Sequence, residues 1–514
     1  MNLIRRNIAA NFAAQGWIAL MGFIFVPFYL RFIGAEGYGL VGFFVLLSST
    51  LTLLDGGLAA TVTRQTAAYI KGDDEHQARI VSLLRTIECL FWALALFIAL
   101  VVAFFAPFIA TRWLNVDPRR IPDVVSAVRL MAVGLLVQFP VAFYNGCLIG
   151  LQRQVKLSVI NSASATLRGV GAVLVLWLVS PTIQSFFTWQ CVLGFITVFW
   201  LRQSLAHTLR GKPGMKAFDT TVLRGVARFT VGVGGINILA FLLTQVDKII
   251  LSKILPLQSF GYYTLAWTLG TFAYRFTGPI FNAYHPRITQ LVTQGDQVEV
   301  IDLHERKELV DLYLKASRVM AIAIVPFSVW LAFFGHELLA LWTHDPRIAA
   351  TAGEALALIA LGTMCNGFMH IPYSLQLASG WTGLAFWQNV VAVILLVPST
   401  YFFAVHYGLT GAALPWLLLN AGYVLISAPL MYRVLLKAAK WSWYRSSVIY
   451  PFLQATLLIG VFHYFSAHLN ESFKGTVVIF FGLLATVGVG ALSAGLVKIR
   501  ALRKFFCRIA SPVT

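Results

Sequence analysis

Charged residues are scarce in this sequence of 514 residues: Asp, Glu, Lys and Arg make up 11%, whereas hydrophobic residues make up 59%. Hydrophilic stretches long enough for a soluble domain are missing, and apolar runs of roughly 20 residues recur along the chain. This pattern argues against a soluble enzyme with one anchor and predicts a polytopic membrane protein. No small-residue cleavage site follows the apolar run that reaches Phe32, so we interpret this run as a retained first helix.

Paired cysteines and enzyme motifs are also absent. The five cysteines occur singly, at Cys89, Cys147, Cys191, Cys365 and Cys507. Neither they nor the scattered His336, His370 and His406 show a metal or redox spacing. No nucleophile elbow, Walker loop or paired-carboxylate motif occurs. We therefore predict no metal, no cofactor and no catalytic residue. We also expect that this chain does not hydrolyse ATP, so any energy for transport must come from another source.

Acidic residues are few, 20 against 39 basic ones, which gives a net charge of +19. Hydropathy predicts about fourteen helices, at 11–33, 37–63, 86–111, 122–148, 154–178, 183–204, 227–252, 258–284, 313–343, 350–376, 382–405, 409–432, 446–466 and 475–497. When residues near the span ends are counted with the adjoining side, 28 of the 39 Lys and Arg residues lie on the side of both termini, 7 on the other side and 4 in span interiors. This bias predicts cytoplasmic termini and explains the basic excess without nucleic-acid binding.

An internal repeat divides the chain. Phe32–Leu40 aligns with Ile254–Tyr262, which places Gly39 on Gly261 at an offset of 222 residues. A second match pairs residues 148–161 with 377–389, at an offset of about 228 residues. Each offset corresponds to six helices, an even number, so we expect two lobes in the same orientation with the substrate path between them. We predict an N-terminal lobe at 1–210, a C-terminal lobe at 211–440, and a helix pair with a basic tail at 441–514.

Two further features follow from the repeat. The hydrophilic segments 64–85 and 287–318 occupy equivalent places after the second and eighth helices, and mixed-sign charge there is typical of solvated connectors or surface helices. Gly56-Gly57 and Gly278-Pro279 lie at matching places in the two lobes. These pairs predict either hinges in the second and eighth helices or sites of tight packing.

Apart from residues assigned to the ends of spans, four basic side chains lie in the predicted span interiors: Arg129, Arg168, Lys248 and Arg275. A charge near the bilayer centre costs roughly 2.5–3.5 kcal/mol on insertion scales, so such residues usually face a protein interior or a wet cavity. Four cations in that setting predict an anionic cargo. Two alternatives remain open, because Arg129 and Lys248 could snorkel to the interface and Arg168 and Arg275 could form internal ion pairs.

Acidic residues within spans are candidates for gating or ion coupling. Asp247 could be a proton or cation site or could neutralise a neighbouring arginine, and it need not pair with Lys248, because adjacent helical residues point about 100° apart. The repeat places Asp55 at a depth similar to that of Arg275, and Arg129 at a depth similar to that of Glu354. We hypothesise that these pairs are an inner and an outer latch, unless the equal depth is accidental. The test is the double variant Asp55→Arg, Arg275→Asp, which exchanges the two charges. If it transports no better than either single variant, the inner latch is wrong.

Several motifs resemble the polysaccharide transporter family of the multidrug/oligosaccharidyl-lipid/polysaccharide exporter superfamily, which includes the Wzx-type O-antigen flippases. The motifs are Asn11–Gln15, Phe32-Ile33-Gly34 with Gly37-Tyr38-Gly39, Leu54–Leu58 with Thr63-Arg64, Gly150–Arg153, and Val246–Leu251. The resemblance covers almost the whole chain. The additional helix pair departs from the twelve helices drawn for many O-antigen flippases.

This resemblance implies alternating access by two lobes in the bacterial inner membrane. The implied cargo is an undecaprenyl-diphosphate-linked oligosaccharide, and the implied partners are membrane lipids, a polysaccharide polymerase and chain-length proteins. Arginine suits such a cargo, because it can contact phosphate oxygens with two parallel donors. We therefore predict that Arg168, Arg275, Lys248 and Arg129 bind the diphosphate. Candidates for stacking on sugar rings are Tyr144, Trp267, Tyr274, Tyr373 and Trp387.

Three other functions stay open. A lipid II flippase shares the superfamily and the fourteen-helix count. A multidrug antiporter of the same superfamily would typically favour cationic drugs and an acidic cavity, which the cationic spans disfavour. A membrane glycosyltransferase or polymerase would usually carry acidic catalytic residues on large outer loops, and all predicted outer loops here are short.

Overall fold

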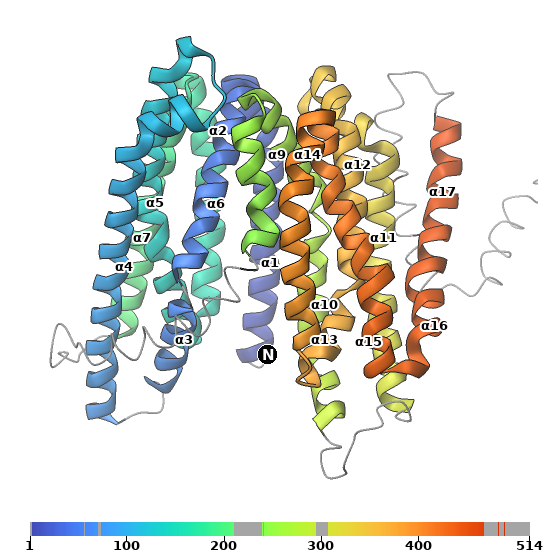
Figure 1. Ribbon diagram of the computed structural model, residues 1–514. Coiled ribbons are helices and arrows are strands. Elements are labelled where there is room, and N and C mark those ends of the chain that lie inside the picture. The colour runs from blue at the N-terminus through green and yellow to red at the C-terminus, as the bar shows by residue number, and fades with distance from the viewer. Residues whose placement is uncertain are drawn as a thin grey trace, which may run out of the picture. The chain divides into compact units, whose positions relative to one another are not determined.

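The computed structural model describes residues 3–55, 57–69, 73–209, 241–293 and 307–466, together with residues 239, 482 and 488 (Figure 1). Every regular element in these ranges is a helix, and Asn115 and Pro256 add an isolated bridge. Nine helical segments among them are long and apolar enough to cross a bilayer. The all-α, multi-pass architecture predicted from hydropathy is therefore confirmed. Residues 227–238 and 240 of the predicted seventh helix, and most of the predicted fourteenth, lie outside the described residues.

The chain divides into two compact units, Met1–Gly261 and Tyr262–Thr514. Residues 241–261, which the repeat assigns to the second lobe, thus belong to the first unit. Hydrogen bonds are among the contacts that attach them there: Trp113 Nε1 donates to Ser252 Oγ at 3.1 Å, and the Leu257 backbone N–H donates to the Asn115 carbonyl at 3.1 Å.

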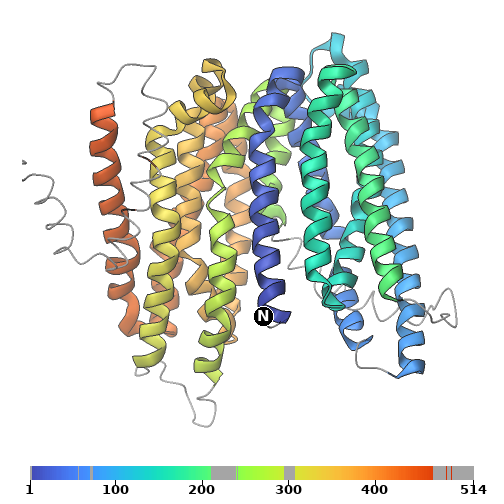
Figure 2. The ribbon, with the colours of Figure 1, turned by 180° about the vertical axis from the view of Figure 1, so that it is seen from behind.

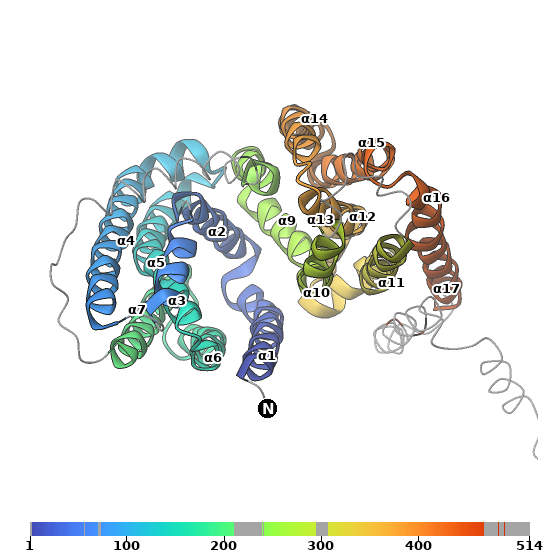
Figure 3. The same ribbon diagram turned by 90° about the horizontal axis from the view of Figure 1, so that it is seen from below.

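The first unit is built around one central helix. Its elements are α1 (Leu3–Ile24), α2 (Val26–Asp55), α3 (Leu58–Tyr69), α4 (Asp74–Phe108), η1 (Ile109–Trp113), η2 (Pro118–Arg120), α5 (Ile121–Gly150), α6 (Gln154–Leu178), α7 (Ile183–Thr208) and helical residues 241–254. Helix α5 packs against α3, α4 and α7, as the view from below shows (Figure 3). Helix α1 runs beside α6 (Figure 2). The core between α3, α4, α5 and α7 includes Phe91, Phe139 and Phe143, which are almost fully buried.

Glycines lie at two helix breaks of this unit. Gly34 has φ 69° and ψ 177° inside α2, and Gly57 has φ 85° between α2 and α3. Positive φ values are accessible to glycine at little steric cost, so both positions can end a helix where other residues would be strained. The boundary predicted between the first two spans therefore falls at Gly34, and the predicted second span is itself divided at Gly57.

The second unit contains most of α9 (Leu257–Gly270), followed by further helices. These are α10 (Tyr274–Thr293), α11 (Lys307–Thr343), α12 (Pro346–Phe368), α13 (His370–Ala378), α14 (Gly383–Gly422), η4 (Tyr423–Ser427), α15 (Ala428–Val434), η5 (Lys437–Ala439), α16 (Lys440–Trp443), η6 (Tyr444–Ile449) and α17 (Tyr450–Ser466). Helix α11 packs against α10, α12 and α17, and α12 packs against α14. The eleventh predicted span and the first part of the twelfth lie in α14, whose backbone leaves helical geometry between them at Gly408, where φ is 61°. The twelfth span continues through η4 into α15.

The break in the predicted eighth span lies elsewhere than expected. Turn residues 271–273 separate α9 from α10, whereas Gly278 and Pro279 lie within α10. The predicted hinge at Gly278-Pro279 stays a prediction; in this conformation both residues lie inside a continuous helix, and a Cβ on Gly278 would meet nothing within 4 Å. In the hydrophilic segment 64–85, α3 extends to Tyr69 and α4 begins at Asp74. The described residues of the segment 287–318 belong to α10, which ends at Thr293, and to α11, which begins at Lys307.

The two glycines aligned by the repeat meet at one helix crossing. A Cβ on Gly39 would lie 2.3 Å from the Leu257 carbonyl oxygen, and a Cβ on Gly261 would lie 2.2 Å from the Ala35 carbonyl oxygen. Helix α2 and the first turn of α9 therefore touch backbone to backbone. A twofold relation between the two matched segments would produce such a reciprocal contact.

Candidate functional site

Arg168 lies in the interior of α6, within a segment apolar and long enough to span a membrane. Protein atoms leave its side chain exposed, and it makes no hydrogen bond or salt bridge to a residue of the described ranges. It is close enough to Tyr29 for an electrostatic interaction. An arginine in this position can accept an anionic group without first breaking an internal ion pair.

The helix that carries Arg168 is held firmly on both sides. Gly169 lets α6 approach the Phe25 ring, since a Cβ there would lie 2.0 Å from a ring carbon. Trp189 Nε1 on α7 donates to the Leu167 carbonyl at 3.1 Å. These contacts fix the backbone on either side of Arg168. The Cα atom of Arg168 is therefore held in place, while its long side chain can still move.

Lys248 and Asp247 form an ion pair. Lys248 Nζ lies 3.1 Å from Asp247 Oδ1 and 3.2 Å from Oδ2, and it also donates to the Thr244 carbonyl at 2.8 Å. Only 12% and 10% of the two side chains are exposed. The long lysine stem curls back one turn, which brings together two residues that helical geometry places on different faces. The structure thus places Lys248 against Asp247, whereas a neighbouring arginine was the cation that the sequence suggested.

Lys248→Ala is expected to destabilise the protein by about 3 kcal/mol, because removing one partner leaves a buried carboxylate without this cation. The double variant Asp247→Asn, Lys248→Met should recover most of that loss, since it removes both charges. Thermal unfolding in detergent measures the effect, and export measures function. A double variant as unstable as the single one would show that the pair is not what stabilises this helix; a stable but inactive one would support ion coupling at Asp247.

The other predicted residues of the first unit have different surroundings. Asp55 Oδ1 accepts the Ala59 backbone N–H at 3.1 Å, so Asp55 satisfies a donor in the first turn of α3. Arg129, in the third turn of α5, is exposed and has no ionic or hydrogen-bonded partner among the residues described. It is thus available to an anion, although the structure brings it into no cluster with Arg168.

The second unit holds the remaining two predicted residues. Arg275 is the second residue of α10, and its side chain is exposed. Glu354 on α12 is exposed and accepts a hydrogen bond from Thr410 Oγ1 at 3.1 Å. Because Asp55 and Arg129 belong to the first unit, the pairings of Asp55 with Arg275 and of Arg129 with Glu354 stay predictions.

Glu88 has partners that the sequence did not indicate. Tyr144 donates its hydroxyl to Glu88 Oε1 at 2.6 Å, and Arg202 Nε lies 3.5 Å from the same oxygen. Trp92 Nε1 donates to the Tyr144 hydroxyl at 3.4 Å. Tyr144 is therefore fully buried and cannot stack on a sugar in this conformation.

Two of the remaining aromatic candidates are accessible and two are packed. Tyr373 and Trp387 are 43% and 66% exposed. Trp267 packs edge-on against Trp416 at a centroid distance of 5.2 Å, and Tyr274 lies 6.1 Å from the His370 ring. Packing thus favours Tyr373 and Trp387 as sugar-contacting residues over the other two.

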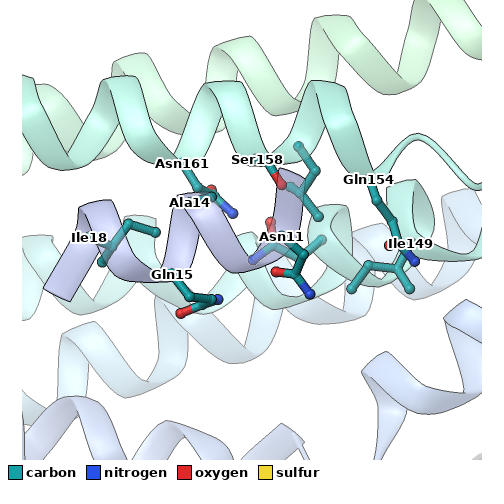
Figure 4. A pocket seen from close by; sticks show the side chains of 10 residues that line it. Asn11, Ala14, Gln15, Ile18, Ile149, Gln154, Ser158 and Asn161 are labelled. Carbon is teal, nitrogen blue, oxygen red and sulfur yellow. The ribbon is translucent and has the colours of Figure 1, made fainter. Parts of the chain in front are cut away.

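A polar pocket that we did not anticipate lies in the first unit, where α1 meets the end of α5 and the start of α6 (Figure 4). Its volume is about 290 Å³. The lining residues are Asn11, Ala14, Gln15, Ile18, Asn145, Ile149, Gln154, Leu157, Ser158 and Asn161. Five of the ten are carboxamides, one is serine and none is charged. Such a pocket can both donate and accept hydrogen bonds, but it offers no fixed charge.

The sequence held a signal for this pocket. Asn11 and Gln15 are four residues apart, and Gln154 and Asn161 are seven apart, so each pair occupies one face of an otherwise apolar helix. We noted Asn11–Gln15 and Gly150–Arg153 as motifs without assigning them a role. No clustering of three or more His, Cys, Asp or Glu side chains suited to a metal occurs in the part of the chain that the structure describes.

Comparison with known proteins agrees with this architecture. A family model described as polysaccharide biosynthesis protein matches residues 4–292. A relative in Rhizobium meliloti (strain 1021), the succinoglycan biosynthesis transport protein ExoT, is 20% identical over 436 residues, which cover 81% of this chain and 78% of the relative.

Two solved structures share the fold. A lipid II flippase, MurJ, in an inward closed conformation aligns over 95% of this chain and 98% of its own, with a TM-score of 0.64 and 14% identity. An inward-facing multidrug transporter of the MATE family in the MOP superfamily aligns over 88% of this chain and 95% of its own, with a TM-score of 0.62 and 14% identity. At these identities the structures establish a shared fold.

Proposed function

Because the chain belongs to the polysaccharide biosynthesis protein family and is a multi-pass membrane transporter of the MOP superfamily, we propose that it is a flippase for an undecaprenyl-diphosphate-linked oligosaccharide. The cargo moves from the cytoplasmic to the periplasmic leaflet of a bacterial inner membrane, for O-antigen or another surface polysaccharide. Both termini lie in the cytoplasm, in accord with the distribution of Lys and Arg.

The observation that carries this proposal is the state of Arg168. It sits in the interior of a membrane-spanning helix, exposed, and without an anionic partner among the described residues. An arginine in such surroundings is costly unless it meets a negative group or water. A diphosphate supplies negative charge and several acceptor oxygens, and a guanidinium can bind them with paired hydrogen bonds.

Other charged residues complete the proposed mechanism. Arg275, Arg129 and Lys248 are further contacts for the diphosphate; for Lys248 this requires the pair with Asp247 to open. Asp55 with Arg275 and Arg129 with Glu354 act as latches that form and break as access alternates, as the charge exchange described above would test. A polysaccharide polymerase and chain-length proteins would receive the transported units.

The test is a deletion strain. Loss of the gene is expected to cause lipid-linked oligosaccharide to accumulate on the cytoplasmic leaflet, as measured by protection from an added periplasmic glycan-modifying enzyme. Purified protein in liposomes should then translocate the extracted lipid. A deletion that leaves the lipid-linked pool and its leaflet distribution unchanged would refute the proposal; translocation of lipid II or of cationic dyes instead would favour the other functions of this superfamily.

A further inference from the structure

The polar pocket between α1, α5 and α6 consists of hydrogen-bonding groups that the protein itself does not use. None of its six polar side chains bonds to another residue of the described ranges. One of them, Asn145, has a buried Oδ1 with no partner. Buried polar atoms are nearly always paired with protein or water, and leaving them unpaired costs free energy. Asn11 and Gln15 are exposed, so the cluster is open to the surroundings and can take up a polar occupant that pairs with Asn145.

The chemistry of the lining indicates what that occupant is. A carboxamide presents one acceptor oxygen and two N–H donors, which matches vicinal hydroxyls that each donate and accept. The absence of charge among the lining residues disfavours a phosphate, a carboxylate or an ammonium group. Ala14, Ile18, Ile149 and Leu157 supply apolar wall between the amides. A volume of about 290 Å³ is at the lower end for ligand pockets, so the occupant is a small ring rather than a chain.

The position of the pocket relates it to Arg168. Gln154, Asn161 and Arg168 follow one another at intervals of seven residues on α6. Seven residues make nearly two turns, so the three side chains share one face of the helix, and Asn161 and Arg168 are about 10 Å apart along its axis. At this separation, one elongated molecule can place a neutral group in the pocket and an anionic group at Arg168.

We infer that this pocket binds a neutral sugar ring of the lipid-linked glycan while Arg168 contacts the diphosphate. The inference rests on the proposed function and adds to it a glycan subsite within the first unit. Asn11 and Asn161 contribute hydrogen bonds from opposite walls, and Asn145 contributes an amide that becomes paired when the sugar enters. The subsite distinguishes a glycosylated carrier lipid from the bare one.

The experiment compares two probes on purified protein in nanodiscs: lipid-linked oligosaccharide extracted from the deletion strain, and undecaprenyl diphosphate without sugar. Wild-type protein should bind the extracted lipid about tenfold more tightly, the effect of two or so hydrogen bonds. The Asn11→Leu, Asn161→Leu double variant keeps side-chain size and should lose this preference without losing affinity for undecaprenyl diphosphate. Glycan released from its lipid shows whether the sugar alone suffices to compete.

Two further variants separate the roles. Arg168→Ala should weaken binding of both lipids and keep the preference between them. Gln184→Leu removes a carboxamide at the start of α7, where Gln184 Nε2 donates to Asp123 Oδ1 at 3.1 Å, and should change neither affinity. If the double variant keeps the wild-type preference while wild-type protein translocates the extracted lipid, the subsite is wrong and the proposed function stands. If wild-type protein translocates neither lipid, the proposed function fails and the subsite with it.

Discussion

Arg168→Ala is expected to lower the rate of translocation of the lipid-linked oligosaccharide by about 100-fold without unfolding the protein. Hydrogen bonds to a charged group contribute about 1.5–3 kcal/mol each, and a guanidinium forms two with one phosphate, so losing both corresponds to a factor of this size or larger. The protein should stay folded, because Arg168 is exposed and pairs with no carboxylate in the described ranges. Export in the deletion strain and translocation in liposomes measure the loss.

Arg168→Lys separates charge from geometry. Lysine keeps the positive charge but loses the planar pair of donors, so translocation should fall between the wild-type rate and that of Arg168→Ala. Lys156→Ala is the matched control, since Lys156 is an exposed cation near the start of the same helix. It should transport normally. Full export by correctly inserted Arg168→Ala protein would remove Arg168 from the site.

Gly39→Ala is expected to reduce the amount of folded protein sharply and to abolish export. The new Cβ would lie 2.3 Å from the Leu257 carbonyl oxygen, which is backbone and cannot rotate away. Forcing α2 away from the first turn of α9 should cost about 1–3 kcal/mol or more, the range for overpacking a close contact. Gly261→Ala should behave alike, because its Cβ would lie 2.2 Å from the Ala35 carbonyl oxygen.

A control for this crossing is present in α1. A Cβ on Gly22 would meet nothing within 4 Å, so Gly22→Ala should leave stability unchanged or raise it slightly through better helix propensity. The melting temperature in detergent compares the variants. The effects of Gly39→Ala and Gly261→Ala should not add, since both act on one contact. If either variant were as stable as the wild type, the backbones of α2 and α9 would have to lie farther apart than in this structure.

Much of the fold could be predicted from the sequence. Hydropathy located the spans because crossing a bilayer requires about 20 consecutive apolar residues, a property of contiguous sequence. The repeat aligned Gly39 with Gly261, and the structure shows that these two glycines touch the same crossing from opposite sides. The position of the second break, at residues 271–273, could not be predicted from Gly278-Pro279, because α10 accommodates Pro279 and Pro286 inside a continuous helix.

The candidate site was predictable only for charged residues. Arg168 was identifiable because a single cation within an apolar span can be recognised in the sequence without knowledge of its neighbours in space. The curl of Lys248 toward Asp247 depends on its side-chain conformation, which helical spacing does not define. Tyr144 was a candidate for sugar contact until its burial and its bond to Glu88 excluded it, and burial depends on neighbours from other helices.

The sequence by itself determined that this chain is an all-helical membrane protein with cations inside its spans, because span length and charge are read along the chain. Only the tertiary structure decided which polar residues share a surface. Asn11 and Asn161 are 150 positions apart, and each is unremarkable on its own helix. They line one pocket because α1 runs beside α6, a consequence of packing between distant segments that composition and periodicity do not encode.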